Sequence, residues 1–190
     1  MRRHGIPTAA YGNFSDYEQA KSYLATAEYP VVIKASGLAA GKGVIIAENP
    51  VEADEALKDM LIRSKFGSSG TSAVIEEYLQ GDEISILTFS DGVTTRTLPS
   101  SQDHKRIFDG DRGPNIGGMG VIAPTPRATP EVMKRIEDEI LQPEFNGLKF
   151  EGLTYTGMLF TGLMLTDSGP KVLEYNARFG CPDTIGLAPA

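Results

Sequence analysis

The spacing of hydrophobic residues along the 190-residue chain alternates between a helical and a strand period. The clearest helical stretch opens at Asn49 and Pro50, residue types that are common at the start of a helix. Its apolar positions then recur three and four residues apart, at Ala53, Ala56, Leu57, Met60 and Leu61. This pattern predicts an amphipathic helix that packs one face on a core.

Capping signals predict two further helices. Ser15 and Glu18 form a capping box ahead of a helix over about residues 16–28. Thr129, followed by a proline and a glutamate, starts a third helix that reaches about Leu141.

Stretches rich in β-branched and aromatic residues predict strands in much of the remaining sequence. They read PVVIKAS, VIIAE, AVIEEYL, EISILTFSDG, VTTRTL, TGMLFTGLMLT and KVLEYNARF. Asp91 and Gly92 favour a hairpin turn, and the residues DSG are expected to join the last two strands. Helices and strands mixed in this way predict an α+β fold.

Residues 100–120 have no hydrophobic period and are rich in glycine and charge. A loop of this length inside a compact domain usually serves a function instead of merely joining two elements. We therefore expect it to contribute to a binding or catalytic site.

Composition narrows the class of protein. The net charge is −7 and the isoelectric point is near 4.9, so the chain lacks the basic surface that binds nucleic acid or an anionic membrane. Cys181 is the only cysteine, which excludes an internal disulfide framework. No apolar run approaches the roughly 18 residues of a membrane span, and the N-terminus lacks the apolar core of a signal peptide. We expect a soluble, cytoplasmic protein.

The glycine-rich stretch KASGLAAGKGV covers residues 34–44 and differs from a nucleotide-binding P-loop. A P-loop has four residues between its glycines and a Ser or Thr after its lysine. Here three residues separate Gly37 from Gly41, and Gly43 follows Lys42. The flanking strands predict a hairpin whose backbone N–H groups could cover phosphates. An ordinary turn with a solvated lysine is the alternative.

The segment LEYNARFG, residues 173–180, carries three polar side chains at alternate positions. On a strand, Glu174, Asn176 and Arg178 would share one face, while the opposite face would pack on the core through Leu173, Tyr175, Ala177 and Phe179. Two oxygen donors at this spacing suit Mg²⁺, and an arginine can neutralise phosphate charge. A solvated strand face is the alternative.

The order of these features resembles the ATP-grasp fold. The segments GIPTA, VVIKASGLAAGKGV, QDHKR, GPNIGGMG and LEYNARFG together closely resemble the phosphoribosylamine–glycine ligase family, over about residues 5–180. The resemblance implies two lobes of antiparallel sheet with packed helices, and a nucleotide bound between the lobes.

The resemblance also implies an ATP site. Lys34 and Lys42 would bind the phosphates, and the loop that contains Gly41 and Gly43 would close over the nucleotide. Four residues at a strand end would read the adenine edge through their backbone, and an acidic residue beyond them would bind the ribose. These residues are Glu76, Glu77, Tyr78 and Leu79 for adenine, and Glu83 for ribose. Without the resemblance, residues 76–79 would be interpreted as the solvated end of an edge strand.

Catalytic and metal-binding residues follow from the same resemblance. Arg106 and Asn115 would face the nucleotide, and Lys105 and Arg178 would act in catalysis. The implied ligands of Mg²⁺ or Mn²⁺ are Glu174 and Asn176. For QDHKR, a surface charge cluster is the alternative.

The implied activity is the ATP-dependent ligation of glycine to 5-phosphoribosylamine, which gives glycinamide ribonucleotide, ADP and phosphate in de novo purine biosynthesis. Another ATP-grasp ligase or carboxylase, or a non-catalytic nucleotide-binding module, are the alternatives. No covalent enzyme intermediate is required, so no Ser, Cys or His nucleophile is expected.

We expect a small lobe over residues 1–75 and a large lobe over residues 76–190. Members of the family are longer, so we expect this chain to be the ATP-binding portion of a protein with flanking domains, which could be fused to other purine-pathway domains. The final residues CPDTIGLAPA depart from the family pattern Asp-Pro-Glu-Thr-Gln at Cys181, Asp183 and Ile185.

Overall fold

The computed structural model describes residues 1–37, 43–63, 65, 70–110, 112–115 and 119–179. Internal contacts divide the chain into two compact units. The smaller unit is Ala9–Leu79, and the larger unit joins Met1–Thr8 to Gln80–Ala190. Both units combine antiparallel sheet with helices, which confirms the predicted α+β class.

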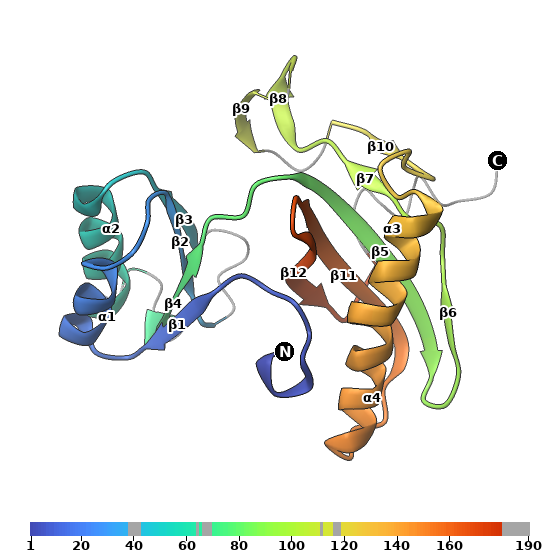
Figure 1. Ribbon diagram of the computed structural model, residues 1–190. Coiled ribbons are helices and arrows are strands. Elements are labelled where there is room, and N and C mark those ends of the chain that lie inside the picture. The colour runs from blue at the N-terminus through green and yellow to red at the C-terminus, as the bar shows by residue number, and fades with distance from the viewer. Residues whose placement is uncertain (38–42, 64, 66–69, 111, 116–118, 180–190) are drawn as a thin grey trace. The chain divides into compact units, whose positions relative to one another are not determined.

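The smaller unit is a four-stranded antiparallel sheet with two helices (Figure 1). In spatial order the strands are β1 (Tyr11–Phe14), β4 (Ala73–Glu77), β2 (Val31–Ala35) and β3 (Val44–Ala47). The helices are α1 (Tyr17–Leu24) and α2 (Pro50–Leu57), and a π turn, η2 (Lys58–Ile62), extends α2. The predicted apolar stripe of α2 packs on the sheet in one core with Ile33 and Ile75.

The helix caps are partly as predicted. Asn49 caps α2, because its side chain accepts from the backbone N–H groups of Val51 and Glu52, each at 3.1 Å. The predicted Ser15 cap of α1 is wrong. Asp16 takes that position and accepts from the N–H of Gln19 at 2.9 Å, and α1 ends at Leu24, earlier than predicted.

The larger unit is built on a second four-stranded antiparallel sheet. In spatial order its strands are β12 (Gly169–Asn176), β11 (Thr156–Thr166), β5 (Asp82–Asp91) and β6 (Thr95–Thr97). Both predicted hairpins form, between β5 and β6 and between β11 and β12. The side chain of Asp91 accepts from two backbone N–H groups of its turn. A short 3-10 turn, η1 (Arg2–His4), precedes the first bridge to this sheet, which Thr8 makes with Val172.

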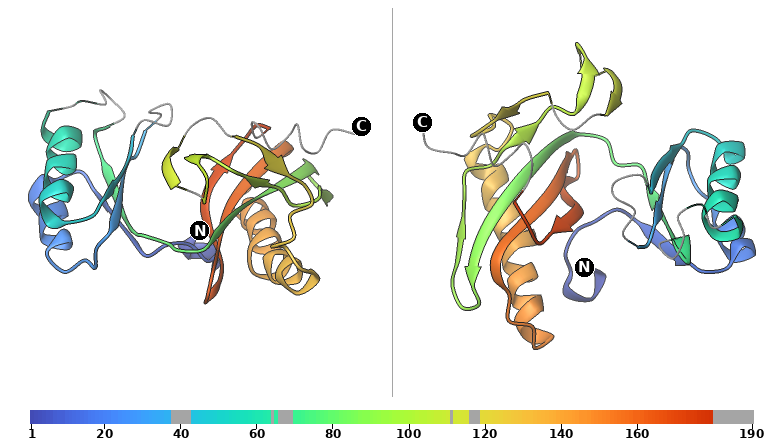
Figure 2. Two further views of the ribbon diagram at one scale, coloured as in Figure 1. Left: turned by 90° about the horizontal axis from the view of Figure 1, so that it is seen from above. Right: turned by 180° about the vertical axis from the view of Figure 1, so that it is seen from behind.

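One continuous helical run covers one face of this sheet (Figures 1 and 2). It consists of α3 (Pro130–Ile136), a π turn η4 (Glu137–Leu141) and α4 (Gln142–Phe150). Thr129 caps it as predicted, but the predicted end near Leu141 is wrong. Pro143 does not end the run; it lies just after the π turn, at the second residue of α4.

The described part of residues 100–120 is not the irregular loop that the sequence predicts. It contributes to two small antiparallel pairs, β7 with β10 and β8 with β9. The strands are β7 (Gln102–Asp103), β8 (Arg106–Phe108), β9 (Arg112–Asn115) and β10 (Val121–Ile122). Strands of two to four residues are too short to show a hydrophobic period, which explains the error.

The sheet of the larger unit has two different faces. Ile84, Ile86, Leu163 and Val172 face the helical run and form a core with its side chains, such as Ile140. The opposite face holds a smaller cluster of Leu87, Met158 and Phe160. Side chains at alternate positions of β5, β11 and β12 therefore point away from the helices, and we refer to this as the open face.

Gly81 permits a close approach of two segments at the start of β5. Its φ angle is +152°, and a Cβ there would lie 2.0 Å from the carbonyl oxygen of Leu165. We expect Gly81→Ala to lower the free energy of unfolding by about 3 kcal/mol or more, because backbone must move to relieve the clash. Urea unfolding would measure the change.

Gly152→Ala is the matched control for this change. Gly152 also has a positive φ angle, +73°, but a Cβ at this position would meet no other atom within 4 Å. Its cost should be only the backbone strain, about 1 kcal/mol. Equal effects of the two substitutions would contradict the close approach as the cause.

Candidate functional site

The smaller unit brings two predicted site residues together. Lys34 on β2 pairs with Val74, two positions from Glu76 on β4, so Lys34 and Glu76 share one face of the sheet. The Lys34 Nζ lies 2.7 Å from Glu76 Oε2, and the two side chains are 25% and 19% exposed. An ion pair this sheltered holds the ammonium in a fixed position more firmly than a solvated pair would.

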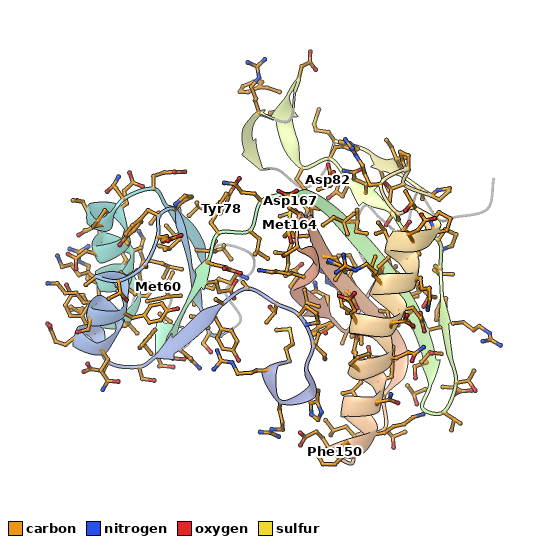
Figure 3. All side chains as sticks on the ribbon, viewed as in Figure 1. Met60, Tyr78, Asp82, Phe150, Met164 and Asp167 are labelled. Carbon is orange, nitrogen blue, oxygen red and sulfur yellow. The ribbon has the colours of Figure 1, made fainter. Side chains whose placement is uncertain are left out.

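The segment predicted to contact adenine follows directly. Glu77 ends β4, and its N–H donates to the carbonyl of Ala10 at 2.9 Å. Because β4 lies between β1 and β2, the alternative of an edge strand is wrong. Tyr78, labelled in Figure 3, is half-buried, and Leu79 is 8% exposed. A cavity of about 200 Å³ in this unit is lined in part by Glu76 and Glu77.

The glycine-rich hairpin lies mostly outside the described residues, and Gly41 and Lys42 are among those not described. Its last residue, Gly43, is buried, and its carbonyl accepts from the N–H of Ala35 at 2.8 Å. This bond continues the β2–β3 pairing by one residue. The predicted lid therefore stays a prediction.

In the larger unit, three predicted residues share the open face. Gly162 on β11 pairs with Ser85 on one side and Glu174 on the other, while Phe160 pairs with Asn176. Glu83 lies two residues before Ser85 and takes the same face. Cross-strand register thus places Glu83, Glu174 and Asn176 on one side of the sheet, away from the helical core.

Lys105 joins this group from the segment between β7 and β8. Its Nζ forms a short ion pair with Glu83 Oε1, and the two side chains are 34% and 38% exposed. Burial alone would lower the pKa of the Lys105 ammonium, but the negative charges of Glu83, Asp103 and Glu174 outweigh burial and raise it. Lys105 is therefore a cation held among carboxylates, and its predicted catalytic role stays a prediction.

Glu174 and Asn176 are in contact, since Asn176 Nδ2 donates to Glu174 Oε1 at 3.0 Å. Gly162 leaves space for this pair: a Cβ at that position would lie 3.2 Å from Glu174 Cγ and 3.3 Å from Phe160 Cε1. Gly162 was not among the predicted site residues, although a glycine inside a strand is a recognised sign of close approach.

These donors fit a magnesium ion in number and kind. Mg²⁺ is commonly held by one or two protein oxygens and completes its shell with water and phosphate oxygens. Within the described part of the chain, no cluster of three or more His, Cys, Asp or Glu side chains could hold a metal ion. A metal at Glu174 and Asn176 would complete its shell with oxygens of water or of a bound phosphate.

Two predictions for the end of β12 are wrong. The strand ends at Asn176, so Arg178 does not continue its alternation; Arg178 is exposed, and its Nη1 donates to the carbonyl of Phe179 at 2.9 Å. Phe179 does not pack on the core. It is 49% exposed and packs in a T-shaped arrangement with the Phe89 ring, with centroids 6.1 Å apart.

A bulge in β12 changes which of its residues face the core. Gly162 pairs with Glu174, but the next residue, Leu163, pairs with Val172, which leaves Leu173 as an extra residue. Tyr175 faces the helical core as predicted, while Val172 takes the core position predicted for Leu173.

The remaining predicted residues, Arg106 and Asn115, pair directly across β8 and β9. Their backbones are therefore neighbours, and their predicted roles toward a nucleotide stay predictions.

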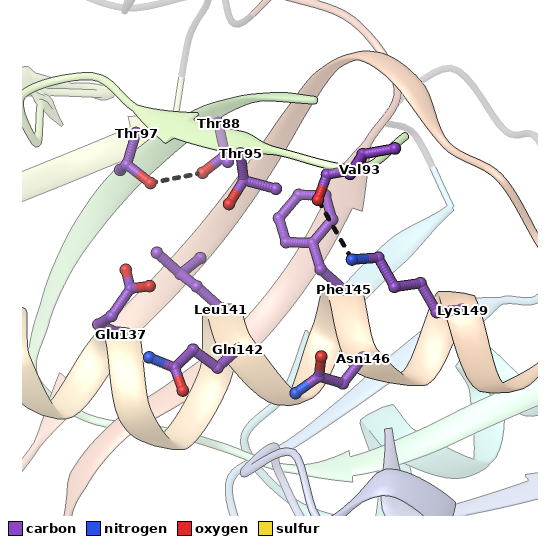
Figure 4. Close-up of a pocket in the computed structure, with 10 residues that line it drawn as sticks. All are labelled: Thr88, Val93, Thr95, Thr97, Glu137, Leu141, Gln142, Phe145, Asn146 and Lys149. Atoms are coloured by element: carbon purple, nitrogen blue, oxygen red, sulfur yellow. Dashed lines mark hydrogen bonds between the residues drawn. The ribbon is translucent and has the colours of Figure 1, made fainter. Parts of the chain in front are cut away.

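The larger unit also has a cavity, of about 190 Å³, which lies away from the predicted site residues (Figure 4). It opens between the β5–β6 hairpin and the helical run, where Lys149 Nζ donates to the carbonyl of Val93 at 3.2 Å. Thr88, which lines it, points to the helix-covered face of the sheet. This cavity is therefore separate from the open face.

Comparison with solved structures defines the class of protein. A phosphoribosylamine–glycine ligase from Thermotoga maritima superposes with a TM-score of 0.87 at 38% identity, over 96% of this chain and 46% of that chain. The biotin carboxylase domain of a 2-oxoglutarate carboxylase from Hydrogenobacter thermophilus, solved with MgADP, has a TM-score of 0.70 at 22% identity, over 94% of this chain and 38% of that one. The chain has the ATP-grasp fold, as predicted.

Sequence comparison identifies the family. Residues 1–184 match the family model described as phosphoribosylglycinamide synthetase, ATP-grasp (A) domain, and the chain belongs to this family. It is 58% identical to the bifunctional purine biosynthetic protein ADE1 of Schizosaccharomyces pombe and 49% identical to a phosphoribosylamine–glycine ligase of Streptococcus pneumoniae. All of this chain is covered, but only 24% and 45% of those proteins. In the described residues, no helix is both long and apolar enough to cross a membrane.

The environment of Lys105 gives a direct test of the described cluster. We expect Glu83→Gln to lower the pKa of the Lys105 ammonium, because burial would then be opposed by fewer negative charges. The side-chain carbon signal of Lys105, followed by NMR as the pH is raised, would report it. Glu139→Gln, which removes an exposed partner of Arg135, should leave the Lys105 titration unchanged. An unshifted Lys105 in the Glu83 variant would contradict the ion pair.

Proposed function

We propose that this chain is the ATP-binding portion of a phosphoribosylamine–glycine ligase. In this reaction ATP is consumed to join glycine to 5-phosphoribosylamine, giving glycinamide ribonucleotide, ADP and phosphate. The observation that carries the proposal is the family match over residues 1–184, and the common open face of Glu83, Lys105, Glu174 and Asn176 supports it.

The charged residues suit the recognition of a nucleotide. In our proposal Lys34 and Lys42 bind phosphate oxygens, and Lys34 exchanges part of its contact with Glu76 for the nucleotide. Glu83 accepts from the ribose hydroxyls, while Arg106 and Asn115 face the nucleotide. The backbone at residues 76–79 reads the adenine edge, next to the cavity lined by Glu76 and Glu77.

Glu174 and Asn176 would hold Mg²⁺ or Mn²⁺. The bound metal would neutralise charge on the phosphates, a role that fits a solved relative of the same fold, which holds MgADP. Gly162 leaves the space in which Glu174 is oriented. Arg178 and Lys105 supply positive charge near the reacting groups, although Arg178 must move away from the carbonyl of Phe179 to do so.

The chemistry requires charge neutralisation and exclusion of water more than a nucleophile of the protein. The glycine carboxylate attacks the γ-phosphate of ATP and displaces ADP, which forms an acyl phosphate. The amine of phosphoribosylamine then attacks the acyl carbon, and phosphate leaves as the amide forms. The protein must align these groups and protect the acyl phosphate from hydrolysis.

The chain spans about a quarter to a half of the length of the curated relatives that it matches. We propose that the whole protein contains further domains, and the bifunctional relatives suggest fusion to other purine-pathway domains. We also propose that the protein is cytoplasmic. Its partners would be small molecules and would include neither nucleic acid nor a membrane.

The metal pair can be tested by nucleotide binding. We expect Glu174→Ala and Asn176→Ala each to raise the Mg²⁺ concentration needed for ATP binding about tenfold or more, because each removes an oxygen ligand. Titration calorimetry at several Mg²⁺ concentrations would measure this. Glu139→Ala, an exposed acid on the helical run, is the control. Parent-like Mg²⁺ dependence in the double variant at 174 and 176 would rule out this pair as ligands.

The ligation itself can be tested on the full-length protein that contains this chain. With ATP, Mg²⁺, glycine and freshly made phosphoribosylamine, we expect ADP and the amide product to appear in equal amounts. Omission of glycine, or its replacement by bicarbonate, should stop both. Turnover with bicarbonate instead of glycine would indicate a carboxylase, and nucleotide binding without turnover would indicate a non-catalytic module.

A further inference from the structure

The segment GIPTA, residues 5–9, is a sequence motif to which the proposed function gives no role. It lies beside β12, the edge strand that carries Glu174 and Asn176 (Figures 1 and 2). Gly5, with a φ angle of +68°, ends η1, and the next residue, Ile6, is buried in the core between the sheet and the helical run. The motif is therefore part of the larger unit up to Thr8.

Pro7 and Thr8 contact the outer edge of β12 through the backbone of one residue, Val172. The N–H of Val172 donates to the carbonyl of Pro7 at 2.8 Å, and Thr8 Oγ1 donates to the carbonyl of Val172, also at 2.8 Å. Val172 is only 1% exposed, so its backbone groups lie away from solvent, where the loss of a hydrogen-bond partner is costly.

Val172 is the last residue before the bulge in β12. On the inner side of the strand it pairs with Leu163, whereas Glu174 pairs with Gly162, so Leu173 is the extra residue. Val172 is thus held from both sides, by β11 and by the N-terminal segment, at the point where the register of the sheet shifts.

The bulge decides which way the proposed metal ligands face. Val172 points into the helical core. Strict alternation from Val172 would turn Glu174 and Asn176 toward that core as well, and would put Tyr175 on the open face. The extra residue reverses this order, because Tyr175 packs on the helical core while Glu174 and Asn176 lie on the open face. Both ligands therefore depend on the bulge staying at Leu173.

We propose that Thr8 is a positioning residue for the Glu174–Asn176 pair. Its hydroxyl, together with the carbonyl of Pro7, fixes Val172 and so keeps the bulge at Leu173, which holds both oxygen donors on the open face. The inference rests on the proposed function in that Glu174 and Asn176 bind a metal. The contact of Thr8 with Val172 is a property of the fold.

Four variants of the full-length protein that contains this chain separate positioning from stability. Thr8→Val keeps the shape of the side chain but removes its hydroxyl, Thr8→Ala removes the hydroxyl as well, and Thr8→Ser retains it. Thr166→Val is the matched control, because Thr166 Oγ1 also donates to a carbonyl of β12 at 2.8 Å, that of Gly169 at the start of the strand. Both valine variants lose the same kind of bond to the same strand, but only Thr8→Val loses it next to the bulge.

The first measurement is the Mg²⁺ concentration at half-maximal ATP binding. We expect Thr8→Val and Thr8→Ala to raise it about three- to tenfold, because a bulge that is less firmly fixed presents the two donors on the open face for only part of the time. Thr8→Ser and Thr166→Val should stay within about twofold of the parent. A parent-like midpoint in Thr8→Val, or an equal rise in Thr166→Val, would overturn the positioning role.

The second measurement repeats this titration in a Glu174→Ala background. There, Thr8→Val should raise the Mg²⁺ requirement much less than it does in the parent, because one of the ligands that it positions is already missing. The same rise in both backgrounds would show that Thr8 affects ATP binding by another route, and would contradict the proposal.

The third measurement requires no ligand. Hydrogen–deuterium exchange, resolved to single amides, follows the Val172 N–H that donates to Pro7. Thr8→Val should speed its exchange several-fold, whereas Thr8→Ser and Thr166→Val should not. If the parent shows no Mg²⁺-dependent ATP binding, the proposed function fails, while this result still tests whether Thr8 fixes β12. Unchanged exchange in Thr8→Val would mean that it does not.

Discussion

The antiparallel pairing of β5 with β11 is the constraint on which the larger unit depends. It joins ten consecutive residue pairs, from Thr156 with Asp91 to Leu165 with Asp82. Because side chains alternate along both strands, this one register decides which residues enter the helical core and which reach the open face. A shift by one residue would exchange Ile84 with Glu83, which would bury a charge and remove the site in a single step.

Electrostatics adds a second level of organisation to this acidic protein. Lys34 and Lys105 are each held by a carboxylate from a neighbouring strand or segment, Glu76 and Glu83 respectively. Such pairs fix the position of a cation at the cost of part of its attraction for an anion. The ammonium groups of Lys34 and Lys105 are thus held in position before a ligand binds. A nucleotide would have to compete with Glu76 or Glu83 for contact with them.

The sequence predicted most of the long elements because their periods are clear. Asn49, Thr129 and the two hairpin turns marked real boundaries, and the open-face positions of Glu174 and Asn176 followed from simple alternation. Alternation failed beyond Asn176 and at the bulge, since a bulge depends on the partner strand and leaves no local signal in the sequence. The ion pairs of Lys34 and Lys105 join residues 42 and 22 positions apart, so they required the sheet register as well. The strands β7 to β10 were missed because two to four residues carry too little pattern.

The two π turns have a consequence for how the helices tolerate changes in length. In η2 the N–H of Arg63 donates to the carbonyl of Lys58, and in η4 the N–H of Gln142 donates to that of Glu137. Each turn holds one residue more than an α-turn of the same span. Each helical run therefore contains a surplus residue at a defined place, where a deletion could convert the wide turn into a regular one. In the longer run, the Thr129 cap at one end and the contacts of Phe150 and Glu151 with His4 at the other could then both be retained.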